Sequence, residues 1–294
     1  EGFVLEVPRG ATMGTLLSRL EADGLTVRDW RWRLFNRLNP VTIKAGEYAL
    51  EPGIRPGDLL GMLATGRVLS YAFTIVEGWS FRRLREELAR NPVLLHELDD
   101  IGGNEALMEY LGAAGMHPEG WFLPETYHFV RGDSDIALLE RAYADMRTAL
   151  NEAWSARADI PLQSPYELLI LASIVEKETA VAAERAEVAG VFVRRLQQGW
   201  RLETDPTVIY GLGEAYDGDI RTRDLRTDTP YNTYTRHGLP PTPIALPGKD
   251  ALQAAARPAG GSAMFFVADG EGGHVFSDTL EEHNAAVRKM LKGN

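Results

Sequence analysis

The stretch "SPYELLILASIVEKET" (residues 164–179) decides the fold of the C-terminal half of the chain. Ser164 is a favourable N-cap, Pro165 suits the first helical position, and Glu167 is the acid of a capping box. The apolar residues that follow predict a helix that continues through Glu178. Because residues 168–175 carry no charge, we expect this helix to lie in the core of a domain.

Two carboxylates, Glu176 and Glu178, end this apolar run. A helix turns about 100° per residue, so the two side chains point about 200° apart. The apolar side chains of the run have a mean direction between Leu171 and Val175. Glu178 falls within about 40° of that direction and Glu176 about 120° from it. The pattern therefore predicts that Glu178 faces the core and that Glu176 faces solvent.

A carboxyl group on a core-facing stripe is costly to ionise, so we expect the pKa of Glu178 to be raised. A raised pKa suits a general acid, for example one that protonates the leaving oxygen in glycoside cleavage. The alternative is a structural glutamate that is hydrogen-bonded to a loop. Asp205 and Asp228 are the candidates for a second carboxylate in a two-acid mechanism.

The neighbouring sequence predicts helices over 133–154 and 184–199, the second ending at Gly199. Beyond residue 200 the chain reads as loops rich in Tyr, Asn, Thr, Asp, Gly and Pro. These loops cover 204–213, 229–248 and 265–284, and "GEGGH" (270–274) reads as a hairpin turn. They could line a groove for a polar substrate, or they could serve turn chemistry alone.

The N-terminal part has strand patterns at 3–7, 48–50 and 71–76 and a helix pattern at 28–38. A weak internal repeat combines a glycine turn with a short amphipathic helix, at 8–20, 51–66 and 76–90. The pattern predicts small β-α-α-β units, either carbohydrate-binding modules or plain packing domains. Residues 91–133 look irregular, and the aromatic segment 117–129 is expected to join the two parts.

Composition excludes several classes of protein. The 294 residues carry a net charge of −11, which argues against nucleic-acid binding and against long-range attraction to anionic lipids, although a local basic patch remains compatible with it. No cysteine is present, so disulfides and thiolate sites are excluded. The six histidines show no two-ligand helical spacing and no GxSxG elbow occurs, so neither a metal site nor a serine triad is expected.

Several ordered blocks of the sequence resemble one family, the endolytic murein transglycosylases (MltG or YceG-like proteins) of the bacterial cell envelope. The similarity spans nearly the whole chain. Its main blocks are "ASIVEKET" (172–179), "VFVRRLQQGWRLETDPTVIYGLG" (191–213), "YNTYTRHGLPPTPIALPG" (231–248) and "HVFSDTLEEHN" (274–284), with weaker matches in "IKAGEYAL" (43–50) and "EGWFLPETYHF" (119–129).

The resemblance implies endolytic cleavage of peptidoglycan without hydrolysis. Glu178 matches the catalytic glutamate of the family, which protonates the β-1,4 oxygen between N-acetylmuramic acid and N-acetylglucosamine. The same carboxylate then assists closure of a 1,6-anhydro ring, so the resemblance implies that no second carboxylate nucleophile and no cofactor are needed.

The resemblance also implies substrate-binding residues in the loops, with Tyr231 and Asn232 as the foremost. The others that match family motifs are Thr204, Asp205, Thr207, Tyr210 and Tyr234. Loop scaffolding is the alternative role for each of them. One departure is Arg194, where the family commonly has Asn.

The implied fold is α+β, with LysM-like β-α-α-β modules before a mainly helical, loop-rich, lytic transglycosylase-like domain. We expect a LysM-like module at 1–75, a second small α/β segment and linker at 76–133, and the catalytic domain at 134–294. The resemblance further implies a single-pass anchor in the bacterial inner membrane, absent from this sequence, with the catalytic part in the periplasm. The implied partners are peptidoglycan strands and peptidoglycan synthases (penicillin-binding proteins). A hydrolytic muramidase and a non-catalytic glycan-binding scaffold are the alternative functions.

Overall fold

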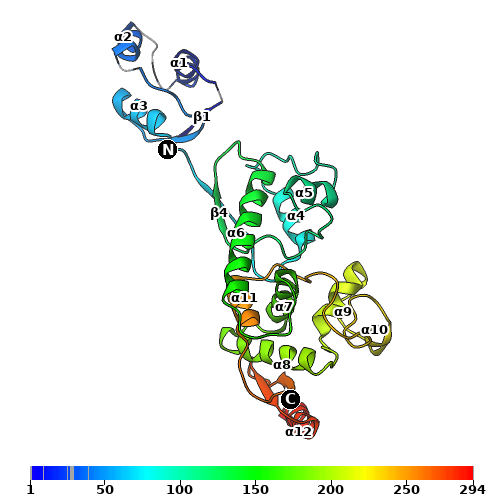
Figure 1. The fold of residues 1–294 in the computed structure, drawn as a ribbon. Coiled ribbons are helices and arrows are strands. Elements are labelled where there is room, and N and C mark those ends of the chain that lie inside the picture. The colour runs from blue at the N-terminus through cyan, green and yellow to red at the C-terminus, as the bar shows by residue number, and fades with distance from the viewer. Residues whose placement is uncertain (1, 9, 25, 27–29, 39, 294) are drawn as a thin grey trace. The chain divides into compact units, whose positions relative to one another are not determined.

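A computed structural model describes residues 2–8, 10–24, 26, 30–38 and 40–293. The architecture is α+β, as predicted, with two-stranded sheets among many helices (Figure 1). The chain forms two compact units that interleave in sequence. The smaller comprises Glu1–Phe73, Asn91–Glu97 and Tyr127–Leu138, and the larger comprises Thr74–Arg90, Leu98–Thr126 and Leu139–Asn294.

The smaller unit begins with the predicted β-α-α-β order. Its elements are β1 (Phe3–Val7), α1 (Met13–Ala22), α2 (Trp30–Leu38), β2 (Gly46–Leu50), α3 (Pro56–Thr65) and β3 (Tyr71–Thr74). Strands β1 and β2 are antiparallel, with Leu5 opposite Tyr48. Both side chains are fully buried, together with leucines of α1 and α3. The predicted helix start at residue 28 lies outside the described residues.

The region predicted as irregular, 91–133, contains regular elements, so that prediction was wrong in part. It holds α5 (Asn104–Tyr110) and β4 (Thr126–Phe129), and β4 pairs with β3. Before it lies α4 (Phe81–Ala89), whose N-cap is Ser80. A seven-residue helix and a four-residue strand are too short to give a clear periodic signal.

The larger unit contains the predicted long helices. They are α6 (Asp135–Ser155), which starts in the smaller unit, α7 (Pro165–Glu178) and α8 (Arg185–Gln197), preceded by the 3₁₀ turn η1 (Ala182–Glu184). The later elements are α9 (Asp205–Leu212), η2 (Gly213–Ala215), α10 (Thr222–Arg226), α11 (Lys249–Ala256), β5 (Phe265–Ala268), β6 (His274–Ser277) and α12 (Leu280–Gly293).

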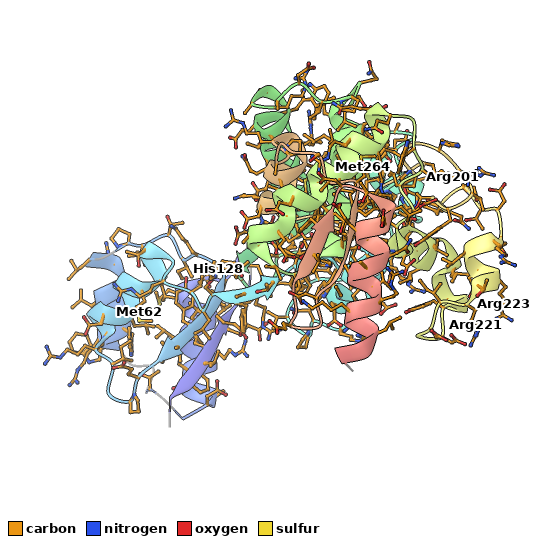
Figure 2. All side chains as sticks on the ribbon, turned by 90° about the horizontal axis from the view of Figure 1, so that it is seen from below. Met62, His128, Arg201, Arg221, Arg223 and Met264 are labelled. Atoms are coloured by element: carbon orange, nitrogen blue, oxygen red, sulfur yellow. The ribbon has the colours of Figure 1, made fainter. Side chains whose placement is uncertain are left out.

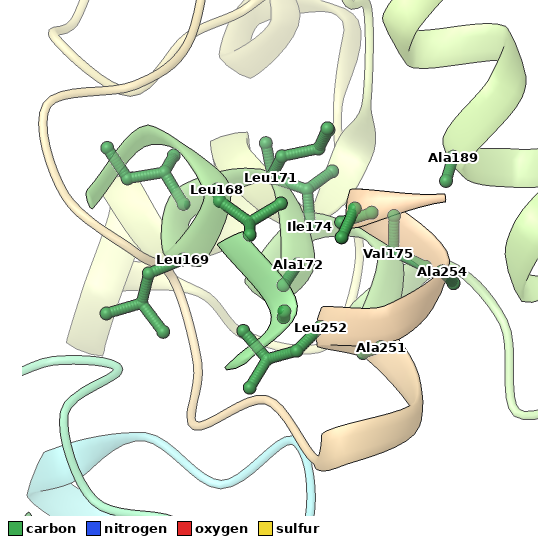
Figure 3. Close-up of a cluster of buried hydrophobic side chains, with 14 of the residues drawn as sticks. Leu168, Leu169, Leu171, Ala172, Ile174, Val175, Ala189, Ala251, Leu252 and Ala254 are labelled. Carbon is green, nitrogen blue, oxygen red and sulfur yellow. The ribbon is translucent and has the colours of Figure 1, made fainter. Parts of the chain in front are cut away.

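Helix α7 is the centre of this unit. Every residue from Leu168 to Val175 is buried, and the helix packs against α8, α9 and α11. Figure 3 shows leucines of α7 beside α11, whose small residues Ala251 and Ala254 allow close approach. The helix prediction for 165–178 is confirmed at both ends, and Ser164 caps it as predicted, its Oγ accepting from the amide of Glu167 at 3.2 Å.

The segment beyond residue 200 is more regular than predicted. Helix α9 lies within the predicted loop 204–213, and α12 begins within the predicted loop 265–284. The hairpin turn at 270–274 is confirmed, because β5 and β6 pair antiparallel on either side of it. Helix α9 was missed because it is short and lies among turn-forming residues, and the loop prediction for 265–284 overlaps only the first turn of α12.

Candidate active site

The candidate catalytic residue, Glu178, ends α7 and is only partly exposed. Burial is the main reason that its pKa is raised, as predicted, and the negative charge of Asp205 raises it further. Three groups act in the opposite direction: the hydroxyl of Thr204, which donates a hydrogen bond to Glu178 Oε1, and His274 and Arg195 through electrostatic interaction. Burial therefore favours the protonated carboxyl of Glu178, while the hydroxyl of Thr204 stabilises the carboxylate that forms when the proton leaves.

Arg195 of α8 supplies a fixed positive charge near Glu178. Its guanidinium is buried and donates from Nε to the carbonyl of Met264 at 2.9 Å and from a terminal nitrogen to the carbonyl of Leu202. Figure 2 labels Met264 in the larger unit. Since both acceptors are main-chain carbonyls, Arg195 is positioned by the backbone, and it forms no ion pair with another described residue.

Thr204, whose hydroxyl contacts Glu178, belongs to a cluster of three threonines that are hydrogen-bonded to one another. Thr204 is the N-cap residue of α9, and its backbone amide donates to Thr233 Oγ1 at 3.1 Å. Thr207 Oγ1 donates to the carbonyl of Thr204 at 2.8 Å and lies 2.9 Å from Thr233 Oγ1. All three threonines are buried, so this cluster fixes the hydroxyl that contacts Glu178.

Asn232 is fully buried (0 % exposed), and both ends of its amide are used by the main chain. Its Nδ2 donates to the carbonyls of Asp224, Leu225 and Thr227, the shortest at 2.7 Å, and its Oδ1 accepts from the amide of Tyr234 at 2.8 Å. The side chain thus joins the end of α10 to the 231–234 turn; Arg223 of α10 and Arg221, just before this helix, are labelled in Figure 2. In this structure Asn232 shapes the loop.

Tyr234 and Asp205 form a direct pair, the hydroxyl of Tyr234 donating to Asp205 Oδ1 at 2.6 Å. The pKa of Tyr234 is raised, mainly by burial and then by this hydrogen bond. The phenol therefore stays protonated and remains a donor at neutral pH. The other carboxylate candidate, Asp228, is exposed and paired with Arg236 at 2.8 Å.

Tyr210 and Tyr231 are ring neighbours, in an edge-to-face contact with centroids 5.0 Å apart. The hydroxyl of Tyr231 lies 2.9 Å from Thr242 Oγ1, and the hydroxyl of Tyr210 donates to Glu119 Oε2 at 3.0 Å. The structure therefore places the predicted binding residues in two groups. Thr204, Asp205, Thr207 and Tyr234 lie in the network around Glu178, and Tyr210 and Tyr231 are linked to Glu119.

Sequence reasoning missed Glu119, which is 2 % exposed. Its Oε1 accepts from the backbone amide of Phe81 at 2.8 Å, in addition to the bond from Tyr210. Burial raises the pKa of Glu119 to about 7, although both hydrogen bonds act to lower it. Glu119 lies in the quoted block 119–129, and a charged residue beside that aromatic run was the signal that could have identified it.

The prediction that Glu176 faces solvent was wrong. Its side chain is only 5 % exposed, and it pairs with Arg185 at 3.3 Å and accepts from the amide of Gly248 at 2.9 Å. Burial raises its pKa as well. The facing argument failed because α7 is enclosed by several helices, and a helix with apolar neighbours on all sides has no single buried face.

Glu184 and His274 form a second feature that the sequence did not reveal. The carboxylate of Glu184 accepts from the backbone amide of His274 at 2.9 Å, and its other oxygen lies 2.7 Å from His274 Nδ1. This pair links the segment just after Glu178 to strand β6, and it lowers the pKa of Glu184. The departure residue Arg194 is also structural, since it donates to the carbonyls of Ala259 and Ala263.

Within the described residues, no three His, Cys, Asp or Glu side chains gather as a metal site would require. No helix in the part of the chain that the structure describes is long and apolar enough to cross a membrane. Around Glu178, the groups available for acid–base chemistry are its own carboxyl, the hydroxyl of Thr204 and the nearby guanidinium of Arg195.

The fold and site define an α+β protein whose central helix ends in Glu178, a carboxyl with a raised pKa and a threonine hydroxyl on Oε1. The chain belongs to the YceG-like family, whose model matches residues 5–289. It is 28 % identical to the endolytic murein transglycosylase of Bacillus subtilis, over 98 % of this chain and 84 % of that protein. It is 26 % identical to the endolytic murein transglycosylase of Streptococcus pneumoniae, over 97 % of this chain but only 58 % of that protein. The fold matches the crystal structure of a yceG-like protein from Listeria monocytogenes, with a TM-score of 0.60 and 27 % identity over 97 % of this chain and 99 % of that one.

Proposed function

We propose that this protein is a peptidoglycan lytic transglycosylase that cleaves glycan strands internally. The shared name of the Bacillus and Streptococcus relatives supports this activity. The observation that carries it in this chain is the environment of Glu178, a carboxyl with a raised pKa and a hydroxyl donor on Oε1. Such a group can hold a proton for a leaving oxygen and can accept one afterwards.

In the proposed reaction, protonated Glu178 transfers its proton to the oxygen between N-acetylmuramic acid and N-acetylglucosamine. The bond from C1 to that oxygen breaks, and positive charge develops on the muramyl ring. The muramyl 6-hydroxyl then attacks C1 while its proton passes to the Glu178 carboxylate. The product is a 1,6-anhydro end, no water is consumed, and Glu178 is again protonated for the next cycle.

The neighbouring residues have positioning roles in this proposal. Thr204 holds Glu178 Oε1 in a fixed direction, and the buried threonine cluster holds Thr204. Asp205 and Tyr234 are proposed to bind the glycan, Asp205 being the more exposed of the two. Tyr231 and Tyr210 are proposed to contact sugar faces, while Thr207 and Asn232, which are buried, would act through the loops that they fix.

The wider setting follows the same proposal. We assign a LysM-like role to the module at 1–75, supported by its β-α-α-β order, and the catalytic domain to 134–294. The protein would work in the periplasm from an anchor in the inner membrane, beside penicillin-binding proteins. Its substrate would be the nascent glycan strand.

The test is product analysis on uncrosslinked glycan strands, comparing the native chain with Glu178→Gln. The proposal predicts anhydro ends, lighter by one water than reducing ends, and a fall of about 10²- to 10⁴-fold in rate for the variant. Reducing ends would indicate a hydrolytic muramidase. Absence of cleavage by the native chain would favour a glycan-binding scaffold.

A further inference from the structure

The outer face of α2 in the smaller unit exposes large apolar side chains at every fourth position. Trp30 is 67 % exposed, Leu34 47 % and Leu38 69 %. At about 100° per residue these three positions fall within about 80° of one another, so they form one stripe along the helix. We call these three residues the α2 stripe.

The α2 stripe is not used for folding the unit. The opposite side of α2 contacts the core, because Trp32 packs against the cluster around Leu5 and Tyr48. Its indole N–H also donates a hydrogen bond to Thr26 Oγ1 at 3.1 Å. Trp32 lies about 160° from the middle of the stripe. A helix with one apolar face buried and a second one exposed has a surface that suits a partner.

Arginines lie on both sides of the stripe. On the same helical wheel, Arg37 falls about 20° before Trp30 and Arg31 about 20° beyond Leu38, and both are exposed. Helix α2 contains no acidic residue. Residues 1–73 contain nine Lys and Arg and eight Asp and Glu, which gives this segment a net charge of +1. Because the whole chain carries −11, residues 74–294 carry a net charge of −12. Arg31 and Arg37 therefore lie in a part of the chain that does not share the net negative charge of the remainder.

The stripe also borders a hollow of about 690 Å³ between α2 and the start of α3. Among the described residues, its lining is mainly apolar, with Arg31 and Arg55 as the cations and Asp58 as the acid. The described residues that line it are Trp30, Arg31, Trp32, Leu34, Leu38, Arg55, Pro56, Gly57 and Asp58.

We propose that the α2 stripe docks on the surface of an anionic lipid bilayer. Trp30, Leu34 and Leu38 would enter the boundary between headgroups and acyl chains, and Arg31 and Arg37 would contact lipid phosphates. Interfacial helices combine Trp and Leu on one face with flanking Arg in this way. A sugar would need paired hydroxyl, amide and carboxylate groups, whereas two of the three stripe positions are leucines. This inference goes beyond the proposed reaction and does not depend on it.

The experiment measures partition of the full chain onto vesicles by flotation. Vesicles of phosphatidylcholine alone are compared with vesicles that contain 30 mol % (roughly the anionic share of a PS- or PG-rich leaflet) phosphatidylglycerol. We expect binding to the anionic vesicles that weakens when salt is raised. Arg31→Gln/Arg37→Gln should lower the partition coefficient about tenfold, and Leu34→Ser/Leu38→Ser by a similar factor.

The matched control is Leu280→Ser/Leu291→Ser on α12, which removes two leucines of similar exposure, 58 % and 67 %, from the larger unit. This control should leave partition unchanged, and circular dichroism melting checks that each variant is folded. The proposal is overturned if the chain ignores anionic vesicles, or if the α2 variants bind them as well as the native chain does. It is also overturned if the α2 variants lose peptidoglycan binding or self-association in place of lipid binding.

Discussion

Glu176 and Glu178 lie two positions apart on α7 and have different partners. Glu178 accepts a hydrogen bond from the hydroxyl of Thr204, whereas Glu176 forms an ion pair with Arg185 and accepts a hydrogen bond from the amide of Gly248. Sequence alone identified the pair and the raised pKa of Glu178. It could not place Glu176, because its contacts with Arg185, beyond the end of the helix, and with Gly248, far along the chain, depend on the tertiary fold.

The different partners predict opposite behaviour on substitution. Glu176→Ala should lower the free energy of unfolding by about 1–3 kcal/mol, because it leaves the amide of Gly248 without its acceptor and removes the most buried of the three carboxylates that pair with Arg185, the others being Glu77 and Asp250. Glu176→Gln should lose less, since an amide oxygen can still accept from Gly248. Urea denaturation measures both. Unchanged stability together with lost cleavage would instead make Glu176 a catalytic residue.

Glu178→Gln should behave the other way, with cleavage lost and stability kept or raised near neutral pH. The pKa of Glu178 is raised in the folded state, so ionising it opposes folding, and this cost grows as pH rises through the folded pKa. A neutral amide removes that cost. Marked destabilisation of Glu178→Gln at pH 7 in urea denaturation would show that its main role is structural.

The raised pKa of Glu119 should make the free energy of unfolding depend on pH. Its pKa is about 7 when folded and near 4.5 when unfolded, so its contribution is fully present below pH 4.5 and is lost as pH rises through 7. The total is about 3 kcal/mol. Glu119→Gln should flatten the stability profile between pH 5 and 8 (roughly the span of this titration) relative to the native chain. An identical slope in both proteins would contradict this assignment.

At the level of elements, α7 was predictable because its cap, its length and its apolar run all agree. The N-cap contributes directly. Ser164→Ala should cost about 1 kcal/mol in unfolding free energy, while Ser164→Asp should cost much less because it keeps a side-chain acceptor. If the two variants are equally stable, the hydrogen bond from the Glu167 amide to Ser164 contributes nothing.

The short elements were not predictable in the same way. Helices α9, α10 and α11 have eight residues or fewer, and strands β3 to β6 have four residues each. At such lengths packing decides the conformation more than pattern does. The site depends on these elements, since Thr204 caps α9 and Asn232 holds the end of α10. The sequence therefore predicted the acid well and its supporting network only as a set of loops.

At the level of the whole molecule, the described residues of the core around Leu5 and Tyr48, including those partly buried, lie between Phe3 and Val68. A fragment of residues 1–70 should therefore fold by itself and unfold cooperatively in urea, although a domain of this size is only marginally stable. Circular dichroism measures the transition. A fragment without a cooperative transition would show that the unit needs its later segments, 91–97 and 127–138.

In the proposed mechanism, Glu178 protonates the oxygen between N-acetylmuramic acid and N-acetylglucosamine and then assists formation of the 1,6-anhydro ring. Mass spectrometry of glycan strands digested by the native chain tests it most directly, with Glu178→Gln alongside. We predict new 1,6-anhydro-muramyl ends from internal cleavage by the native chain and almost none from the variant. Reducing ends, or equal cleavage by the two proteins, would contradict the proposed mechanism.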